Sequence, residues 1–390
     1  MSIWGRRAAL AALELLLVAS VVGLAVIGFG AVLDTTHGTA IDPELDPSAP
    51  GYEAFVEASA TLAVLGRDDA GALAWVNAFA LAGGPGAGGA VFLVPVATLV
   101  PDFSADLETL AQVDAGDGAD ATRQAVANTL GAGMGDIVEL DPTRLAELVR
   151  PVAPLTVLNP DAADGFASGE LSLGAEDVPR FLLATEAGES DLTRLARHEA
   201  LWQAWFAAVG ASADPDVVPG ETDSGIGRFL RGLAGGPVTV DVPPVEPEAA
   251  ADGSTVFRLD VLATFDLMEQ RIPFPAAPRP GARVRIRVLD GVGADALAVR
   301  AGRDVVRAGG QVVVVGNSDR FDPEAATRVV YVEPDVADEA EIIADHLGVV
   351  AELIGGPNPD DGVDITVVAG ADLLAAYGLT PRATIGGDAG

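Results

Sequence analysis

An apolar run near the N-terminus extends from about Ala8 to Leu33 and is broken only by Glu14. A helix needs roughly 20 apolar residues to cross a bilayer, so this run is long enough to span one with some tilt. Arg6 and Arg7 precede it and acidic sequence follows it, which places the N-terminus in the cytoplasm. The sequence thus predicts a single-pass protein of the cell membrane with its bulk extracytoplasmic. The alternative is a cleaved signal peptide, whose apolar core is normally shorter, at about 7–15 residues.

The charge balance disfavours several classes of protein. With 57 acidic and 23 basic residues, the formal net charge is −34. A field this negative argues against nonspecific binding to nucleic acid, because both carry the same sign. The chain has no cysteine, which removes disulfides, thiolate metal sites and cysteine nucleophiles. Its three histidines, His37, His198 and His346, lie in different regions and do not predict a shared metal site.

The outer part of the chain alternates strand-like and helix-like segments, which predicts an α/β fold in two domains. The first is expected to be mixed α/β with a central sheet, and the second to be a small two-layer α/β module. Stretches bearing proline before each domain are typical of linkers. The predicted organisation is a cytoplasmic tip and anchor at 1–34, a linker at 35–55, a first domain at 56–275, a linker at 276–281, a second domain at 282–373 and a tail at 374–390.

Local signals place several elements of the first domain. Asp141 followed by Pro142 is a helix start, with an acidic cap and proline in the first turn. An amphipathic helix is predicted over 191–209, and its Trp202 and Trp205 are expected in the core, because helical spacing places them on the buried face. Other expected elements are strands at 90–96, 136–140, 155–158, 238–242 and 255–262 and a helix at 119–130.

The second domain carries a resemblance to a known family. The segments that carry it are Arg287–Gly293, Ala308–Val312, Gly316-Asn317, Thr327–Tyr331 and Asp364–Asp372. In this order and spacing they resemble the LytR C-terminal domain of cell-envelope proteins, over about residues 282–373. Asp290-Gly291 stands where that family usually has Asn-Gly. The resemblance implies a fold and a place in the cell envelope more than an activity.

A glycine-rich loop in the same domain matches a second, looser pattern. Gly291, Gly293 and Ala296 lie between a predicted strand and helix and satisfy the dinucleotide fingerprint G-x-G-x-x-A. The acidic residue expected after the next strand is displaced to Asp319, and the extracytoplasmic side lacks the cofactor. We therefore interpret the loop as a tight strand-to-helix turn.

Residues 56–275 resemble, more weakly, the LytR-CpsA-Psr catalytic domain that usually precedes this module. That family transfers glycopolymers from a polyprenyl-pyrophosphate carrier to peptidoglycan. The task needs arginines that grip pyrophosphate oxygens and carboxylates that hold Mg²⁺ against them.

Two motifs of that pattern are retained. Arg67 and Asp69 resemble the family's Arg-x-Asp entry motif, which implies a phosphate-binding and a Mg²⁺-binding residue. The segment Asp191-Leu-Thr-Arg194-Leu-Ala-Arg197-His198 resembles the family's Asp-x-x-Arg-x-x-Arg-Gln helix, with His198 in place of Gln. Arg194 and Arg197 share a helical face suited to a joint anion grip, with Asp191 and His198 in support. The alternative is a surface helix capped by Asp191 whose arginines pair with nearby acids.

The losses weigh more than the retained features. The family's strand ends in Pro-Arg-Asp-Thr, but here Val96 and Ala97 replace the Arg and the Asp. Other basic positions fall near Glu108, Leu183 and Thr185. Several missing guanidinium groups would leave two or more phosphate charges unpaired, so transfer by the family mechanism is not expected.

The sequence therefore predicts a membrane-anchored cell-envelope protein that binds or scaffolds without catalysis. Its expected partners are the membrane and a polyprenyl-linked glycan, peptidoglycan or an active transferase of the family. No cofactor is expected, and Mg²⁺ only where the phosphate site is retained. The alternative is a diverged phosphotransferase or pyrophosphatase that acts on polyprenyl-pyrophosphate-linked glycans through Arg67, Asp69, Arg194 and Arg197.

Overall fold

The predicted anchor falls outside the part of the chain that the structure describes. This computed structural model describes residues 44–83, 87–100, 107–186, 188–212, 214–222, 224–272, 274–279, 281–354 and 362–382. Within these ranges, none of the helices is long and apolar enough to span a bilayer.

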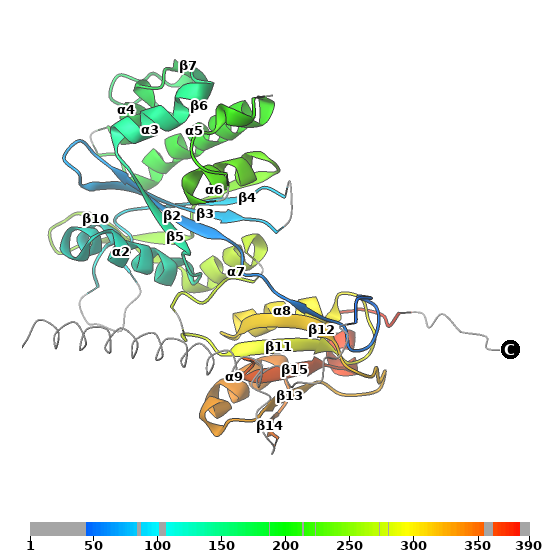
Figure 1. Cartoon of the computed structure of the whole chain (residues 1–390). Helices are drawn as coiled ribbons and strands as arrows, with labels where there is room; N and C mark the ends of the chain where they lie inside the picture. Colours follow the sequence, from blue (N-terminus) through cyan, green and yellow to red (C-terminus); the bar gives the residue numbers. More distant parts are fainter. Residues whose placement is uncertain are drawn as a thin grey trace, which may run out of the picture. The chain divides into compact units, whose positions relative to one another are not determined.

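The first predicted domain, called the middle domain below, is built on a mixed sheet (Figure 1). Its strands are β2 (Thr61–Arg67), β3 (Leu73–Leu81), β4 (Gly89–Val94), β5 (Asp136–Leu140) and β8 (Val238–Asp241). They lie in the order β5-β2-β3-β4-β8. The three inner strands pair antiparallel with one another, and each edge strand pairs parallel with its neighbour.

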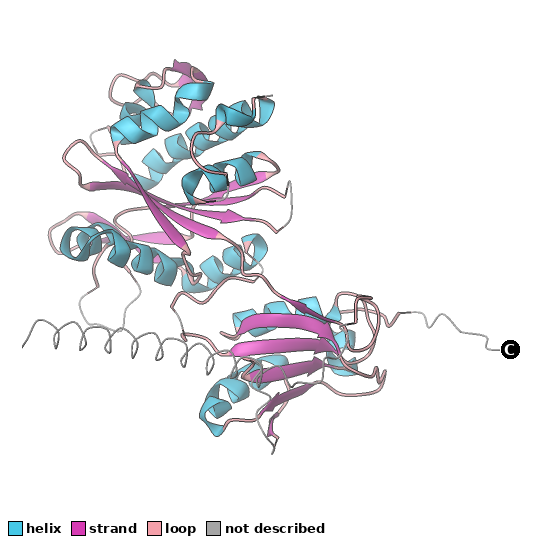
Figure 2. Ribbon diagram, viewed as in Figure 1, coloured by secondary structure: helices cyan, strands magenta, loops and turns pink. Residues whose placement is uncertain are grey.

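Helices cover both faces of this sheet. They are α2 (Leu110–Leu130), α3 (Pro142–Val149), α4 (Asp177–Leu183), α5 (Asp191–Ala211), α6 (Gly225–Ala234) and α7 (Val261–Arg271). Alternate residues of a strand point to opposite faces. Leu62 and Val64 of β2 therefore join the core under α3 to α6, whereas Ala63 and Leu65 join the core under α2 and α7. Figure 2 shows the sheet between these two helical layers.

Two hairpins complete the middle domain. Strands β6 (Leu155–Asn159) and β7 (Gly169–Leu173) pair antiparallel, as do β9 (Val245–Ala249) and β10 (Thr255–Leu259). Short 3₁₀ helices lie at Arg150–Val152 and Pro215–Val217.

The C-terminal domain is a second α/β unit with its own core. Its strands are β11 (Arg285–Asp290), β12 (Gln311–Asn317), β13 (Arg328–Tyr331), β14 (Ala351–Leu353) and β15 (Ile365–Ala369), joined by β1 (Glu53–Phe55). The sheet order is β1-β12-β11-β15-β13-β14. The helices are α8 (Leu297–Arg307), α9 (Ala337–Leu347) and α10 (Ala371–Ala376), with a 3₁₀ turn at Pro334–Val336.

Strand β1 comes from the stretch predicted as a linker before the middle domain. It pairs antiparallel with β12, with Ala54 opposite Val315. The amide of Val56 donates to Val313 and that of Asn317 to Tyr52, at 2.9 and 2.7 Å. The C-terminal sheet is therefore built from two segments of the chain that flank the whole middle domain.

The Gly316-Asn317 pair of the LytR-like pattern holds this N-terminal segment. A Cβ at Gly316 would lie 2.2 Å from the carbonyl oxygen of Tyr52, so only glycine permits the close approach of β1. The side-chain amide of Asn317 donates to the carbonyls of Pro47 and Ala49, at 3.0 and 2.7 Å. Gly316 and Asn317 thus hold the N-terminal segment and β1 against β12.

The expected mixed α/β architecture with central sheets is confirmed, and several elements differ in extent. Trp202 and Trp205 are buried, as predicted. The strand expected over 255–262 ends at Leu259, because Asp260 caps helix α7 by accepting the amide of Ala263. The helix expected over 119–130 is preceded by further helical turns from Leu110, with non-helical backbone at Gly118.

Candidate functional site

Arg67, the retained residue of the entry motif, is neutralised by two carboxylates. It ends strand β2, and its two Nη atoms donate to both oxygens of Asp114 on α2. Its Nε donates to Glu139 at the end of β5, at 2.9 Å. The hydrogen bond that Arg67 donates to Asp114 is the main cause that raises the pKa of Arg67. The Nε, Nη1 and Nη2 donors of this guanidinium thus already bind carboxylates of the same domain, which leaves no pair of donors for a bidentate contact with an external anion.

Asp69, the candidate magnesium residue, lies in the exposed turn between β2 and β3. The neighbouring Asp68 holds this turn by accepting the amides of Ala70 and Ala72. The turn lines a cleft of about 970 Å³. Besides Arg67, the charged residues of this cleft are Asp68, Asp69, Asp114, Glu139 and Asp141.

Asp114 and Glu139, two of these carboxylates, are not free to coordinate Mg²⁺. Mg²⁺ needs carboxylates that are free to coordinate it in near-octahedral geometry. Both oxygens of Asp114 accept from Arg67, and one of them also accepts from Thr122. Among the described residues, no group of three or more acidic or histidine side chains is placed to hold a metal ion.

Arg197 lies fully buried on α5 and is likewise paired. Its Nη atoms donate to Glu189 at 2.6 and 2.8 Å, to Asp161 at 3.1 Å, and to the carbonyl of Ala184 at 2.6 Å. Burial lowers the pKa of Arg197, but the hydrogen bonds and charges of Glu189 and Asp161 outweigh it and leave the pKa raised. In return, Arg197 lowers the pKa of Glu189.

Arg194 and Asp191 pair with each other along the same helix. The Nη2 of Arg194 donates to Asp191 at 2.8 Å, and both side chains are largely covered. The helix cap is Ser190, whose hydroxyl accepts the amide of Thr193, and not Asp191 as the surface-helix interpretation supposed. The same interpretation also predicted that the arginines pair with nearby acidic residues, and Arg194 and Arg197 do so.

His198, which replaces the family's glutamine, is buried and neutral. Its Nε2 donates to the carbonyl of Leu182 at 3.0 Å, and its ring meets the edge of Trp75. Desolvation, helped by the charge of Arg194, lowers the pKa of His198 to about 3. A neutral, enclosed imidazole of this kind supports packing rather than proton transfer at neutral pH.

The structure does not bring the predicted site residues together. Arg67 binds Asp114 of α2, the helix packed on one face of the sheet. Arg197 and His198 belong to α5, which packs on the opposite face. Arg67 and Arg197 are therefore each bound to separate carboxylates of the chain and do not share a partner among these contacts.

Val96 and Ala97, the two replaced positions, follow β4. Their carbonyls accept the amides of Ala111 and Phe257, both at 3.0 Å. Both side chains line a cleft of about 560 Å³, whose cation, Arg258, is paired with Glu248. The strand end is thus held by backbone contacts and offers no free charge to a phosphate.

Sequence reasoning missed the carboxylates that decide these sites. Asp114 and Glu139 lie 47 and 72 residues from Arg67, and Asp161 lies 36 residues from Arg197. With 57 acidic residues in the chain, nothing local distinguishes these partners. The closest signal is Glu189, eight residues before Arg197.

The glycine loop of the C-terminal domain is a turn, as interpreted. The buried carboxylate of Asp290 accepts the amides of Val292, Gly293 and Ala294, at 2.9, 3.0 and 2.6 Å. These are the amides that would otherwise face a phosphate. Asp290 thus occupies the anion position of the loop from within.

Residues 283–373 match the family model described as LytR cell envelope-related transcriptional attenuator. None of the curated proteins matches the chain.

Three similar solved structures have low identity. Lin1025 of Listeria innocua is 16% identical, with 55% of this chain and 97% of that chain covered and a TM-score of 0.41. B. subtilis TagT is 14% identical, with 59% and 93% covered and a TM-score of 0.43. B. subtilis TagV is 14% identical, with 55% and 96% covered and a TM-score of 0.45. Residues 283–373 therefore form a domain that matches the LytR C-terminal domain, as the sequence pattern predicted.

Proposed function

We propose that this chain is a membrane-anchored, extracytoplasmic protein that binds or scaffolds in cell-wall glycopolymer assembly and does not catalyse transfer. One observation carries the proposal. The guanidinium groups retained from the transferase pattern, those of Arg67 and Arg197, are each bound by two carboxylates of the chain itself. Their positive charges are therefore already neutralised by ion pairs within the chain.

Two further observations agree with this proposal. Val96 and Ala97 remove a cation and a carboxylate from the end of β4. Leaving one member of a buried ion pair without its partner costs about 3–5 kcal/mol, so a substrate that took Arg197 would leave Glu189 as an unpaired buried charge. The enzyme alternative would also need both Arg67 and Arg197 to exchange their carboxylate partners for a substrate.

The test is an activity assay on the purified full chain in detergent. Polyprenyl-pyrophosphoryl saccharide, Mg²⁺ and peptidoglycan are supplied, and release of polyprenyl phosphate or inorganic phosphate is followed. An active transferase of the family serves as the positive control. We expect no turnover above buffer. Turnover that disappears in both the Arg67→Gln and the Arg197→Gln variants would instead establish the diverged enzyme.

A scaffold must still bind something, and its candidate partners are a polyprenyl-linked glycan, peptidoglycan or an active transferase. Thermal unfolding with each partner at the same concentration ranks them, because the stabilisation grows with the ratio of concentration to Kd and reaches about 2.7 kcal/mol at a ratio of 100. A chain that none of the three stabilises would not be a scaffold for them.

A further inference from the structure

The C-terminal sheet has one edge that the chain closes and one that it leaves open. Strand β1, from a distant part of the chain, pairs with β12 at one end of the sheet. Strand β14 is the last strand at the other end, beside β13 (Figure 1). Among the described residues, only β13 pairs with β14. The sheet thus already holds one added strand, and its second edge offers the same kind of pairing.

Backbone groups of β14 point away from the sheet. In a parallel pair, every second residue of a strand turns its amide and carbonyl towards the neighbouring strand. The amide of Ile354 donates to the carbonyl of Tyr331 on β13 at 2.8 Å, so Ala351 and Leu353 turn theirs to the open edge. Such groups are a template for a further strand. Strand β14 is short, but it contains neither Lys nor Pro, and its register with β13 has no bulge.

Exposed apolar side chains accompany these backbone groups. Among the described residues, eleven large apolar side chains are exposed, and three of them lie within residues 350–354. Val350, Leu353 and Ile354 are 81, 56 and 40% exposed. Such a concentration of exposed apolar surface on one strand is typical of a site of protein contact.

The two faces of this edge differ in character. Side chains alternate along a strand, so Val350 and Ile354 lie on the face opposite to Ala351. Ala351 packs on the core that α9 covers. The edge therefore presents apolar side chains on its outer face and helix α9 on its inner face.

The exposed surface of α9 is acidic. Its four acidic residues are all exposed, and they make no ion pair within the described part of the chain: Asp338, Glu339, Glu341 and Asp345. On β14 itself, Glu352 is paired with Arg328 at 2.8 Å. Unpaired charges of one sign beside a binding surface favour a partner of the opposite sign.

A second copy of the chain fits this edge less well than a cationic segment. Antiparallel pairing of β14 with itself about its centre would place Glu352 opposite Glu352, and like charges directly opposite destabilise a strand pair. Each copy also carries a net charge of −34, so two copies repel each other.

We propose that the β14 edge binds an extended, cationic segment of another protein, which joins the C-terminal sheet as a seventh strand. Apolar side chains on one face of the segment lie beside Val350 and Ile354, and Arg or Lys side chains on its other face meet the carboxylates of α9. Backbone hydrogen bonds supply affinity in such contacts, and the alternating side chains supply specificity. The proposal uses no residue of the middle domain, so it can fail without affecting the proposed function.

The test is fluorescence anisotropy of labelled synthetic peptides titrated with the full chain in detergent, at about 0.15 M salt to screen long-range attraction. The first peptide alternates Val with Arg. The second has the same side chains but is methylated on every backbone nitrogen, so it keeps the charge and loses the amide donors. The third alternates Val with Glu. We expect the first to bind, the second to bind at least about tenfold more weakly, and the third not to bind.

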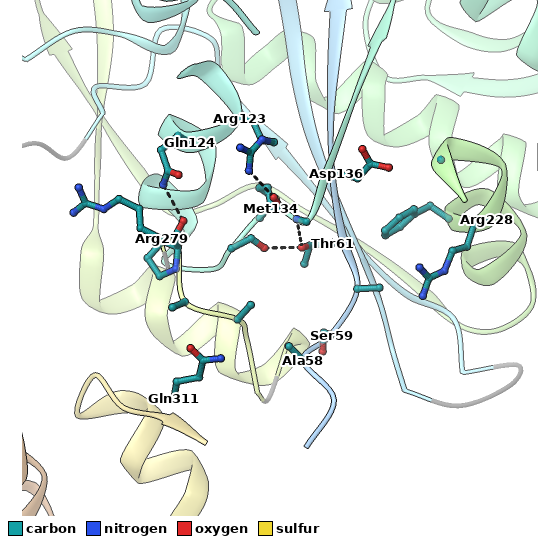
Figure 3. A pocket seen from close by; sticks show the side chains of 18 of the residues that line it. Ala58, Ser59, Thr61, Arg123, Gln124, Met134, Asp136, Arg228, Arg279 and Gln311 are labelled. Atoms are coloured by element: carbon teal, nitrogen blue, oxygen red, sulfur yellow. Dashed lines mark hydrogen bonds between the residues drawn. The ribbon is translucent and has the colours of Figure 1, made fainter. Parts of the chain in front are cut away.

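Two variants and a matched control locate the binding. Leu353→Pro removes an amide that faces the open edge and should weaken binding at least about tenfold. Glu341→Gln/Asp345→Asn leaves the backbone unchanged and should weaken it about fivefold, the scale of two exposed ion pairs. Asp117→Asn/Asp136→Asn removes two exposed carboxylates from the middle domain and should bind like the parent. Figure 3 shows Asp136 at the start of β5.

Several outcomes would overturn the proposal. Equal binding of the methylated peptide would mean attraction by charge alone, without an added strand. Equal effects of the two carboxylate variants, an unchanged affinity in Leu353→Pro, or no binding of the Val-Arg peptide would do the same. A dimer of the chain alone in sedimentation, abolished by Leu353→Pro, would mean that a second copy occupies the edge instead. Hydrogen exchange at β13 checks that Leu353→Pro keeps the rest of the sheet.

Discussion

Arg197 shows how surroundings decide what a motif residue does. Its guanidinium is fully buried, and its ion-pair partner Glu189 is only 5% exposed. A charge in such a place stays stable only while its partners stay charged. The residue that resembles a substrate clamp is therefore part of the scaffold of α5.

Changing Glu189 to Gln tests this structural role. The substitution leaves Arg197 with the half-exposed Asp161 as its charged partner, so the free energy of unfolding should fall by about 3–5 kcal/mol. Urea denaturation of the full chain measures the change. Glu176→Gln is the control, because its partner Arg150 is exposed and such pairs contribute about 0–1 kcal/mol. Similar losses in both variants would show that Arg197 does not depend on Glu189.

His198 predicts a pH dependence of stability. Its pKa is about 3 in the folded chain and about 6.5 when unfolded. Below pH 6.5 the unfolded chain takes up a proton that the folded chain refuses, so stability falls as pH drops towards 3. At pH 5 this one residue should cost about 2 kcal/mol relative to pH 8.

Unfolding free energies between pH 8 and pH 5 check this expectation. The His198→Gln variant should lose about 2 kcal/mol less than the parent over that range. His346→Gln, which changes an exposed histidine, should keep the parent's dependence. A parent curve that is flat from pH 7 to 5 would contradict a buried, neutral imidazole.

At the scale of elements, the pairing of β1 with β12 makes a testable prediction about the C-terminal sheet. A proline at position 54 removes the amide opposite Val315 and should open the pairing with β12. Hydrogen exchange at the amides of β12 should then quicken, while that of the middle-domain strands stays unchanged. Phe55→Ser is the control, because that side chain is 86% exposed. Unchanged protection of β12 in the Ala54→Pro variant would mean that β1 adds little.

Elements with local signals could be predicted from the sequence, and those without could not. Asp141 accepts the amide of Arg144 and starts α3 where its Asp-Pro signal placed it. The capping box of Thr109 and Gln112 was equally readable, but the glycines that follow hid the start of α2. Helix α7 was missed because Val261 and Leu262 are exposed, so its apolar residues continue the strand pattern of β10.

At the scale of the whole molecule, the sequence indicated two domains but not how the chain is shared between them. The C-terminal pattern was recognisable because its strands and turns follow one another closely. The partner of β12 lies more than 250 residues away, and no local pattern in Glu53–Phe55 identifies a strand. The same limit applies to the candidate site, where long-range carboxylates decided the outcome.

The route of the chain also determines how the molecule bears load. The carbonyl of Ser48 accepts from Arg382, so the first and last described segments meet at the C-terminal domain. A pull from the N-terminal side would reach β1 and its hydrogen bonds with β12 before it reached β2. Under such a force the hydrogen bonds between β1 and β12 would break first, and the force would reach the middle domain only after β1 had separated from its sheet.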